Sequence, residues 1–469
     1  MCQRYHKYHR MEDDSIHAFS EMGLRIPRIQ VPKEGTDYEK WAVVACDQYT
    51  SEPAYWEEAD RIVGSSPSTL RMILPEYYLG KPQEEELTKQ IRRHMKQYEE
   101  TGVLRTLPEG CMLVKRTAAG RTRLGLVIAV DLEAYDYAKG STSMIRATER
   151  TITERIPPRL RIRRGAPIEL PHIIILIDDP EKTVIEPLAE KKGTVVYDTD
   201  LMLDGGHITG TFFPKEELGG VQEAFSRLYD KSTERFGKGK EFLMAMGDGN
   251  HSLATAKAAW EEIKQALTAQ ERENHPARYA LCELENVHDD GIVFEPIHRV
   301  LFGEGKLTGD EIVRKTVEIL KKQNPDAYLA EESDEDEAGA VGLAGREAAQ
   351  RMTQTSRKAD SYRIPVIYGG TRRVLVIYHP ISGLEVGALQ TALDELVRTE
   401  GVRIDYIHGE QTVSELASTM ENAGFLLPSM DKHRLFPAVA ADGALPRKTF
   451  SMGHANEKRY YMEGRSLLM

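Results

Sequence analysis

Cysteine is scarce in this sequence, with 4 residues among 469. Cys2, Cys46, Cys111 and Cys282 are far apart and form no CxxC pair, which argues against a disulfide framework or a structural zinc site. Long apolar runs are also missing, since no stretch approaches the roughly 18 to 20 residues that span a bilayer. The N-terminal residues are polar and lack the apolar core of a signal peptide. We therefore expect a reduced, cytoplasmic protein with no membrane-spanning part.

Familiar signatures of nucleotide and hydrolase sites are absent as well. The sequence contains no GxxxxGK(S/T), no GxGxxG after a predicted strand, no GxSxG and no HExxH. Nothing in it points to zinc, haem or flavin. Basic residues are outnumbered, with 62 Lys and Arg against 74 Asp and Glu and a net charge of −12. This acidity makes a nucleic-acid partner unlikely unless a local basic patch exists.

What is present predicts an α/β or α+β fold with mixed sheets, because strands and helices are interspersed and hairpins occur beside crossovers. A strand is expected at 41–46, a charged amphipathic helix at 84–100, and hairpins at 111–131 and 363–380. The hairpin turns fall at Ala118-Ala119-Gly120 and at Gly369-Gly370.

Composition divides the chain into four parts. The composition predicts a mobile leader at residues 1–25 and the main α/β domain at residues 26–325. Residues 326–362 are acidic and then Ala-rich, which is typical of an insertion or linker. Residues 363–469 predict a C-terminal hairpin and helical region that packs on the main domain.

One turn stands out, in the segment FLMAMGDGNHSLATAKAAWEEI at 242–263. An apolar strand end precedes the turn, and the helix after it has an apolar face. Gly247 and Gly249 permit positive φ or a close approach of the backbone to a ligand. Ser252 is placed to cap the helix, whose free N–H groups form an anion site. The segment therefore predicts a ligand site, although a capped structural turn would use the same glycines.

The other polar residues of this turn leave several roles open. Asp248 would repel a phosphate unless a metal or a proton intervened, or it points away and holds His251 or a substrate hydroxyl. Asn250 supplies a neutral donor and acceptor. His251 can bind an anion, donate a proton or accept one.

A second candidate lies at 145–164, IRATERTITERIPPRLRIRR, where seven arginines fall within twenty residues. Arg146 is expected on a helix that Pro157 and Pro158 end. If the next stretch is extended, Arg159, Arg161 and Arg163 project from one face, a row suited to phosphate oxygens. Surface ion pairs with Glu149, Glu154 and Glu169 are the alternative. Weaker candidates are His288, Asp289 and Asp290 for a divalent cation, His408 with Glu410, and Arg447 with Lys448.

The segments GDGNHSLATAK, WAVVACDQYTSEPAYWEE, FEPIHRVLF, DYIHGE and LPRKTFSMGHANEKRYY, together with the arginine-rich segment, resemble the bacterial and archaeal proteins grouped as domain of unknown function 1015. The resemblance runs from about Pro27 to Arg465 and implies a shared fold without an established activity. The family box usually has an arginine after the histidine, where this chain has Ser252. The turn is also similar to the phosphate-binding box of the ParB and sulfiredoxin superfamily, which includes a free-serine kinase and implies a nucleotide phosphate at this position.

These features together predict a nucleotide-dependent phosphotransferase that acts on a small hydroxylated metabolite such as serine. Residues 247–252 would hold a phosphate of a nucleoside di- or triphosphate, with Mg²⁺, and the arginine row would neutralise the transferred group. Asp248 or His251 would orient or deprotonate the acceptor hydroxyl. The alternative is a non-catalytic protein that binds a nucleotide or another anionic metabolite. A third hypothesis, DNA binding of the segregation type, is disfavoured by the net charge.

Overall fold

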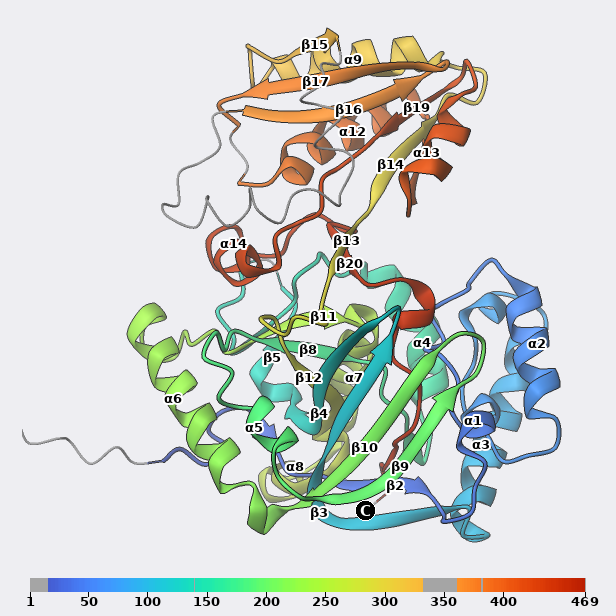
Figure 1. The fold of residues 1–469 in the computed structure, drawn as a ribbon, viewed down its shortest axis with the longest axis vertical. Coiled ribbons are helices and arrows are strands. Elements are labelled where there is room, and N and C mark those ends of the chain that lie inside the picture. The colour runs from blue at the N-terminus through green and yellow to red at the C-terminus, as the bar shows by residue number, and fades with distance from the viewer. Residues whose placement is uncertain (1–15, 139, 332–360, 381–382, 469) are drawn as a thin grey trace, which may run out of the picture.

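The structure is a computed structural model that describes residues 16–138, 140–331, 361–380 and 383–468. It has two lobes (Figure 1), a larger one around an eleven-stranded sheet and a smaller one around a six-stranded sheet. Helices and strands are mixed in both lobes, which confirms the predicted α/β or α+β class.

The larger sheet is mixed. Its strands in spatial order are β5 (Tyr135–Asp136), β6 (Ile145–Arg146), β11 (Met244–Asp248), β8 (Ile174–Ile177), β12 (Tyr279–Asn286), β4 (Arg121–Asp131), β3 (Leu104–Ala118), β10 (Gly206–Pro214) and β9 (Thr194–Leu201), with β1 (Leu24–Arg25) on β4 and β2 (Arg28–Pro32) on β3. β11 pairs in parallel with β6 and antiparallel with β8. The hairpin predicted at 111–131 is confirmed, since Ala118 pairs with Arg121 while Ala119 and Gly120 take positive φ.

Helices cover this sheet and extend from its edges. They are α1 (Tyr38–Trp41), α2 (Pro53–Val63), α3 (Glu84–Glu100), α4 (Ile156–Arg163), α5 (Glu186–Ala189), α6 (Gly219–Phe236), α7 (Asn250–Ile263) and α8 (Ala269–Asn274), with the 3-10 turns η1 (Thr69–Arg71), η2 (Glu76–Tyr78), η3 (Leu132–Ala134), η4 (Thr153–Arg155), η5 (Lys215–Glu217), η6 (Lys264–Ala266) and η7 (Pro276–Arg278). In Figure 1, α6 lies on one side of the lobe, and α2 and α3 lie on the other. The helix predicted at 84–100 is confirmed as α3, which buries Ile91, Met95 and Tyr98.

The strand predicted at 41–46 is wrong. Helix α1 ends at Trp41, and beyond it only Val44 makes a β-bridge, with Tyr460. The apolar character of the run is real, because Trp41, Val43 and Val44 are fully buried. A buried irregular segment and a buried strand have the same composition, so the pattern did not distinguish them.

The smaller lobe contains β15 (Tyr328–Glu331), β17 (Thr371–Tyr378), β16 (Ser361–Tyr368), β19 (Asn422–Phe425), β14 (His298–Phe302) and β18 (Arg403–Ile407), in this spatial order. Its helices are α9 (Gly309–Lys321), α12 (Glu385–Glu400) and α13 (Glu410–Ala417). The second predicted hairpin is confirmed, with Tyr368 paired to Thr371 around the Gly369-Gly370 turn.

The chain crosses between the lobes and then returns. β13 (Phe294–Pro296) leads into the smaller lobe, and β20 (Phe450–Met452) pairs with it on the way back, after η8 (Lys432–Arg434) and α14 (Leu435–Asp442). The last stretch, with η9 (Ala455–Glu457), runs down through the larger lobe (Figure 1). It ends in β21 (Arg465–Ser466), which pairs with β7 (Ile168–Glu169).

The four predicted parts of the chain can be compared with the two lobes only where the structure describes their residues. Residues 1–15 of the leader and 332–360 of the acidic insertion lie outside the described residues. Within the leader, Leu24 is buried and pairs with β4. β14 belongs to the smaller sheet, although the predicted main domain runs to 325. The domain boundaries stay a prediction.

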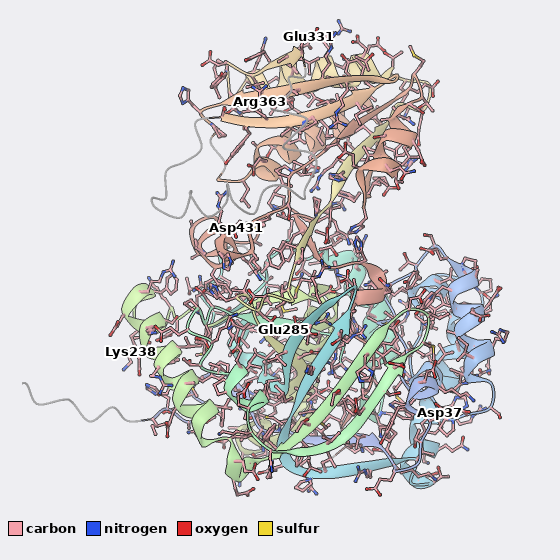
Figure 2. The ribbon with its side chains drawn as sticks, in the orientation of Figure 1. Asp37, Lys238, Glu285, Glu331, Arg363 and Asp431 are labelled. Carbon is pink, nitrogen blue, oxygen red and sulfur yellow. The ribbon has the colours of Figure 1, made fainter. Side chains whose placement is uncertain are left out.

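Charged side chains are buried between the strands of the larger lobe. Glu285, labelled near its centre in Figure 2, is fully buried on β12 and accepts a hydrogen bond of 2.8 Å from Arg123. On the same strand Glu283 pairs with Arg459 of the returning C-terminal stretch. Because an unpaired buried charge is strongly destabilising, the Glu283–Arg459 contact ties the C-terminal stretch to the middle of the sheet.

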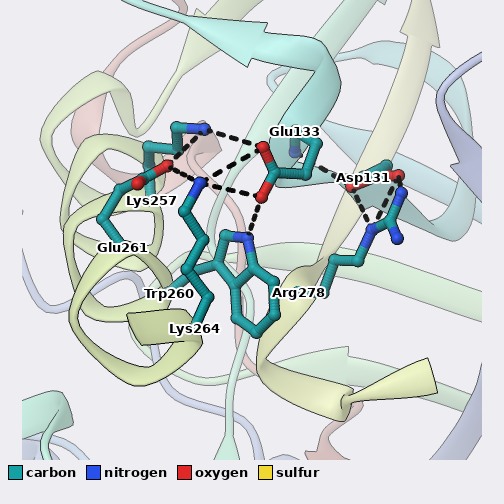
Figure 3. A network of polar contacts seen from close by, with 7 residues as sticks. All are labelled: Asp131, Glu133, Lys257, Trp260, Glu261, Lys264 and Arg278. Atoms are coloured by element: carbon teal, nitrogen blue, oxygen red, sulfur yellow. Dashed lines mark hydrogen bonds and ion pairs between the residues drawn. The ribbon is translucent and has the colours of Figure 1, made fainter. Parts of the chain in front are cut away.

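A polar network fixes the far end of α7 (Figure 3). The indole N–H of Trp260 donates to Glu133 at 2.6 Å, and Lys264 reaches both Glu133 and Glu261. The indole itself is fully buried. The helix is therefore anchored to η3, just after β4, and its N-terminus is held in a fixed position.

We expect Trp260→Ala to lower the free energy of unfolding by about 3–5 kcal/mol, because it empties a fully buried aromatic site. Trp260→Phe keeps most of the ring and loses the N–H bond to Glu133, so its cost should be about 1 kcal/mol. Urea denaturation followed by circular dichroism measures both. Equal losses in the two variants would show that the hydrogen bond, and not packing, dominates at this position.

Candidate functional site

The predicted strand-to-helix junction is present. β11 ends at Asp248, and α7 begins at Asn250 after a left-handed Gly249 with φ of 77°. Added side-chain atoms would be crowded at both glycines, since a Cβ would lie 2.6 Å from Met452 Sδ at Gly247 and 3.1 Å from Ile173 Cα at Gly249. At Gly249 the left-handed backbone and the nearby Ile173 backbone favour glycine whatever the site binds, whereas at Gly247 a side chain would displace the flexible end of Met452.

The predicted cap at Ser252 is wrong. Gly249 is the N-cap residue, and the Ser252 N–H donates to its carbonyl at 2.9 Å. Ser252 therefore lies inside the first turn. Since no side chain caps the helix, the amides at its start remain available to a ligand.

These residues line a cavity of about 750 Å³. Its walls come from the first turn of α7, from α4, from the N-terminal segments around residues 46–50 and 72–79, and from the smaller lobe at 405–408. All six residues from Gly247 to Ser252 face it. The size lies in the range of about 300–1,000 Å³ that is usual for small-molecule sites.

A lysine neutralises Asp248. The Lys458 ammonium lies 3.1 Å from Asp248 Oδ2 and 2.9 Å from Ser451 Oγ. Burial alone would raise the pKa of Asp248, but the charge and hydrogen bond of Lys458 outweigh it and hold the pKa below its usual value. Asp248 is therefore a carboxylate at neutral pH whose charge is cancelled by Lys458.

His251 is neutral. Its Nε2 accepts the Ile152 N–H at 3.4 Å, which leaves the ring proton on Nδ1. Burial, reinforced by the positive charges of Arg159 and Arg155, lowers the pKa of His251 to about 4. Of the three predicted roles, binding an anion through the Nδ1–H of a neutral ring fits these contacts best.

Asn250 has an unused acceptor. Its Oδ1 atom is buried and has no hydrogen-bond partner in the described structure. A buried polar atom without a partner is unfavourable, so a donor from a bound molecule would stabilise the site here.

The predicted extended row of arginines is wrong, because residues 156–163 form the helix α4. Pro157 and Pro158 occupy its first turn, where proline needs no hydrogen-bond donor, so they begin a helix instead of ending one. The predicted helix around Arg146 is wrong too, since Arg146 ends the strand β6.

The helix distributes the four predicted arginines differently. Arg159 and Arg163 face the cavity but are paired, with Glu76 at 2.7 Å and with Glu169 at 2.6 Å. Arg161 is exposed and contacts Glu84 at 3.2 Å. Arg146 lies outside the cavity lining, over the ring of Phe242. Ion pairing therefore accounts for the arginine row, as the alternative held, but of the three glutamates it named only Glu169 is a partner, and Arg159 and Arg161 pair with Glu76 and Glu84 instead.

Two other cations in the cavity lining are unpaired. Arg155 and Lys448 make no ion pair with any described residue, and both lower the pKa of His251 through their positive charge. Lys448 also has a left-handed backbone with φ of 57°, and its N–H donates to Glu149 at 2.9 Å. Non-glycine residues held in this conformation often occur at functional sites.

Sequence reasoning missed Lys458, Arg155 and the part played by Glu149. Glu149 lines the cavity near Asp248, and burial raises its pKa, although Lys448 opposes the shift. All three lie in segments that resemble the family, but no local pattern assigns them a role, and Lys458 lies 210 residues from its partner Asp248 in the chain.

The weaker candidates form no common cation site. His288 contacts Asp178 at 2.7 Å and His433 at 2.9 Å, while Asp289 accepts backbone N–H groups and Asp290 pairs with Lys182. His408 lines the cavity, whereas Glu410 pairs with Arg372. Within the described ranges no group of three or more His, Cys, Asp and Glu side chains is arranged to hold a metal ion, and no helix is long and apolar enough to cross a membrane.

The family is shown by comparison with known sequences. Residues 31–386 match the model of DUF1015, described as a protein of unknown function, and the chain belongs to this family. No curated protein matches it.

Three solved structures are distantly similar. A conserved hypothetical protein from Pyrococcus furiosus aligns with a TM-score of 0.33 and 11% identity, over 72% of this chain and 90% of that one. A free serine kinase in complex with AMP aligns with a TM-score of 0.37 and 11% identity, over 73% and 92%. A C-terminally truncated SbnI from Staphylococcus aureus gives 0.31 and 10%, over 70% and 82%. At such scores the function of this chain has to be inferred from its own side chains.

We expect the His251 ring to titrate near pH 4, because its surroundings disfavour the charged form. In the unfolded chain the pKa is about 6.5, so the unfolded state takes up this proton first as the pH falls. His251 therefore reduces stability progressively between about pH 6.5 and 4. NMR of histidine-labelled protein, with His251→Gln to assign the signal, measures the midpoint. A midpoint near 6.5 would mean that the ring is solvated and not part of the cationic wall.

Proposed function

We propose that this chain is a nucleotide-dependent phosphotransferase acting on a small hydroxylated metabolite, with serine as the first candidate. The observation that carries the proposal is the uncapped N-terminus of α7, which opens into a cavity of about 750 Å³ beside Arg155 and Lys448, two cations with no ion-pair partner in the described part of the chain. A helix N-terminus and cationic side chains attract phosphate for the same electrostatic reason. We also propose that the chain is distantly related to the ParB and sulfiredoxin superfamily and that it works in the cytoplasm.

The phosphates of the donor would lie between the start of α7 and the unpaired side chains of Arg155 and Lys448. The α7 amides, the neutral His251 Nδ1–H and the two cations supply hydrogen bonds and positive charge there. The Lys458 ammonium removes the main objection to a phosphate at this turn, because it cancels the charge of Asp248.

For the transfer, the hydroxyl group of the acceptor has to face the terminal phosphate of the donor. The acceptor hydroxyl oxygen attacks the terminal phosphorus, a new P–O bond forms, and the bond to the bridging oxygen breaks. The nucleotide leaves with one phosphate fewer, and the Asp248 carboxylate takes the hydroxyl proton. Mg²⁺ in such sites is held by one or two carboxylates together with phosphate oxygens, and Asp47 is a cavity carboxylate suited to this role.

A non-catalytic binding protein is the second candidate. The low pKa of His251, caused first by burial, and the lowered pKa of Asp248 beside Lys458 both weaken the two residues as proton acceptors. A site with good phosphate contacts and poor bases binds without turnover. Transfer of labelled phosphate from ATP to serine or another hydroxy compound, with and without Mg²⁺, separates the two candidates.

We expect Arg155→Ala and Lys448→Ala each to weaken ATP binding about tenfold or more, since each removes a charge-assisted contact to phosphate. Arg161→Ala is the matched control, because its side chain is exposed and paired with Glu84 outside the cavity. Isothermal titration calorimetry with Mg·ATP measures the three. Equal losses at all three positions would mean that long-range charge, and not a local site, governs binding.

His251→Ala tests the turn directly. The shape of the turn depends on Gly249 and on packing, so stability should fall by about 1 kcal/mol or less. Affinity for ATP should fall about tenfold, because a donor to an ionised phosphate is lost. Calorimetry and thermal denaturation of the same sample give both values. Unchanged affinity with a much lower melting temperature would make His251 a structural residue.

A further inference from the structure

The cavity has two chemically different ends, which lie at the two ends of α4. Arg155 precedes the helix, and its charge acts on His251 at the start of α7. Residues that follow the helix, such as Ala166 and Ile168, also line the cavity. Eight helical residues span roughly 12 Å, so a ligand that touches both ends has to be elongated.

The end beyond α4 is apolar. Its lining residues belong to one hydrophobic cluster that joins α3, α4 and the segments beside them, and they include Met72, Leu74, Met95, Ile162, Ile168 and Leu170. They are aliphatic or thioether side chains, which adapt to the shape of a bound group. This wall is part of the cavity lining, so it offers apolar surface to whatever the cationic end holds.

The charges near this apolar end are cancelled. Arg163 is paired with Glu169, which also accepts from Arg465, and Arg159 is paired with Glu76. Arg155 and Lys448, which have no ion-pair partner among the described residues, act on His251 at the other end, together with the paired Arg159 in the middle of α4. The cavity therefore changes from cationic to neutral and apolar along α4.

We propose that the apolar end of the cavity binds the nucleobase of the phosphoryl donor, so that the nucleotide lies along α4 with its phosphates at α7. This inference rests on the proposed function, because it takes the donor to be a nucleotide. An uncharged base gains by leaving water for an apolar wall, whereas the phosphates gain only at the cationic end. A nucleotide carries both groups, so its phosphates can lie at the cationic end while its base lies at the apolar end.

Calorimetry with Mg·ATP and with inorganic tripolyphosphate tests the proposal on the full chain. The two ligands share the triphosphate and differ in the nucleoside. We expect the wild-type chain to bind ATP at least about tenfold more tightly, through burial of the base. Ile162→Asn places a polar amide in the apolar wall and should remove most of this preference while tripolyphosphate binding stays the same. Lys448→Ala should weaken both ligands by the same factor.

Leu170→Asn repeats the test from another segment, in case Ile162→Asn lowers stability, and Ile263→Asn changes an exposed apolar residue at the far end of α7 as a control. Equal wild-type affinity for the two ligands overturns the base assignment and leaves the phosphate site standing. Tighter binding of octyl phosphate than of ATP also overturns it, in favour of an aliphatic ligand. If the wild-type chain binds neither ATP nor tripolyphosphate, the proposed function itself fails.

Discussion

The Lys458–Asp248 contact is the interaction on which the cavity depends. A carboxylate at the mouth of a helix N-terminus would otherwise occupy the positive end of the helix and repel any anion. The ammonium of Lys458 lies 3.1 Å from that carboxylate and is itself held by Ser451. The next residue, Arg459, is buried and pairs with Glu283 and Glu463. Two consecutive cations of the C-terminal stretch thus neutralise carboxylates of the larger lobe.

The presence or absence of an acidic partner also distinguishes basic residues that look alike in the sequence. Arg159, Arg161 and Arg163 are neighbours in an arginine-rich segment, yet each has a glutamate partner. Arg155 and Lys448 have none among the described residues and lie near a histidine that stays neutral. Whatever energy such an ion pair contributes, it removes a cation from the set that can bind phosphate. Which basic residues are available is therefore a property of the fold and not of local composition.

The sequence predicted those parts of the fold that depend on local pattern. Both hairpins, helix α3 and the junction between β11 and α7 follow from periodicity and glycine turns, and all are present. The arginine row failed because alternation of charged and aliphatic residues fits a strand, whereas Pro157 and Pro158 favour the first turn of a helix. The role of Lys458 was not predictable, since no local rule links it to a turn 210 residues earlier. Membership of DUF1015 places the chain in a family whose function is not known, so the site has to be understood from these contacts.

The return of the C-terminal stretch also sets an order of events during synthesis. The smaller lobe, from β14 to β19, is made before Lys458, Arg459 and β21 leave the ribosome. Until then Glu283 lacks its buried partner, Asp248 lacks its ammonium, and β7 lacks its partner strand. The larger lobe, although most of it is translated first, is completed last, and the nascent chain carries a half-built cavity with excess negative charge while the second lobe folds.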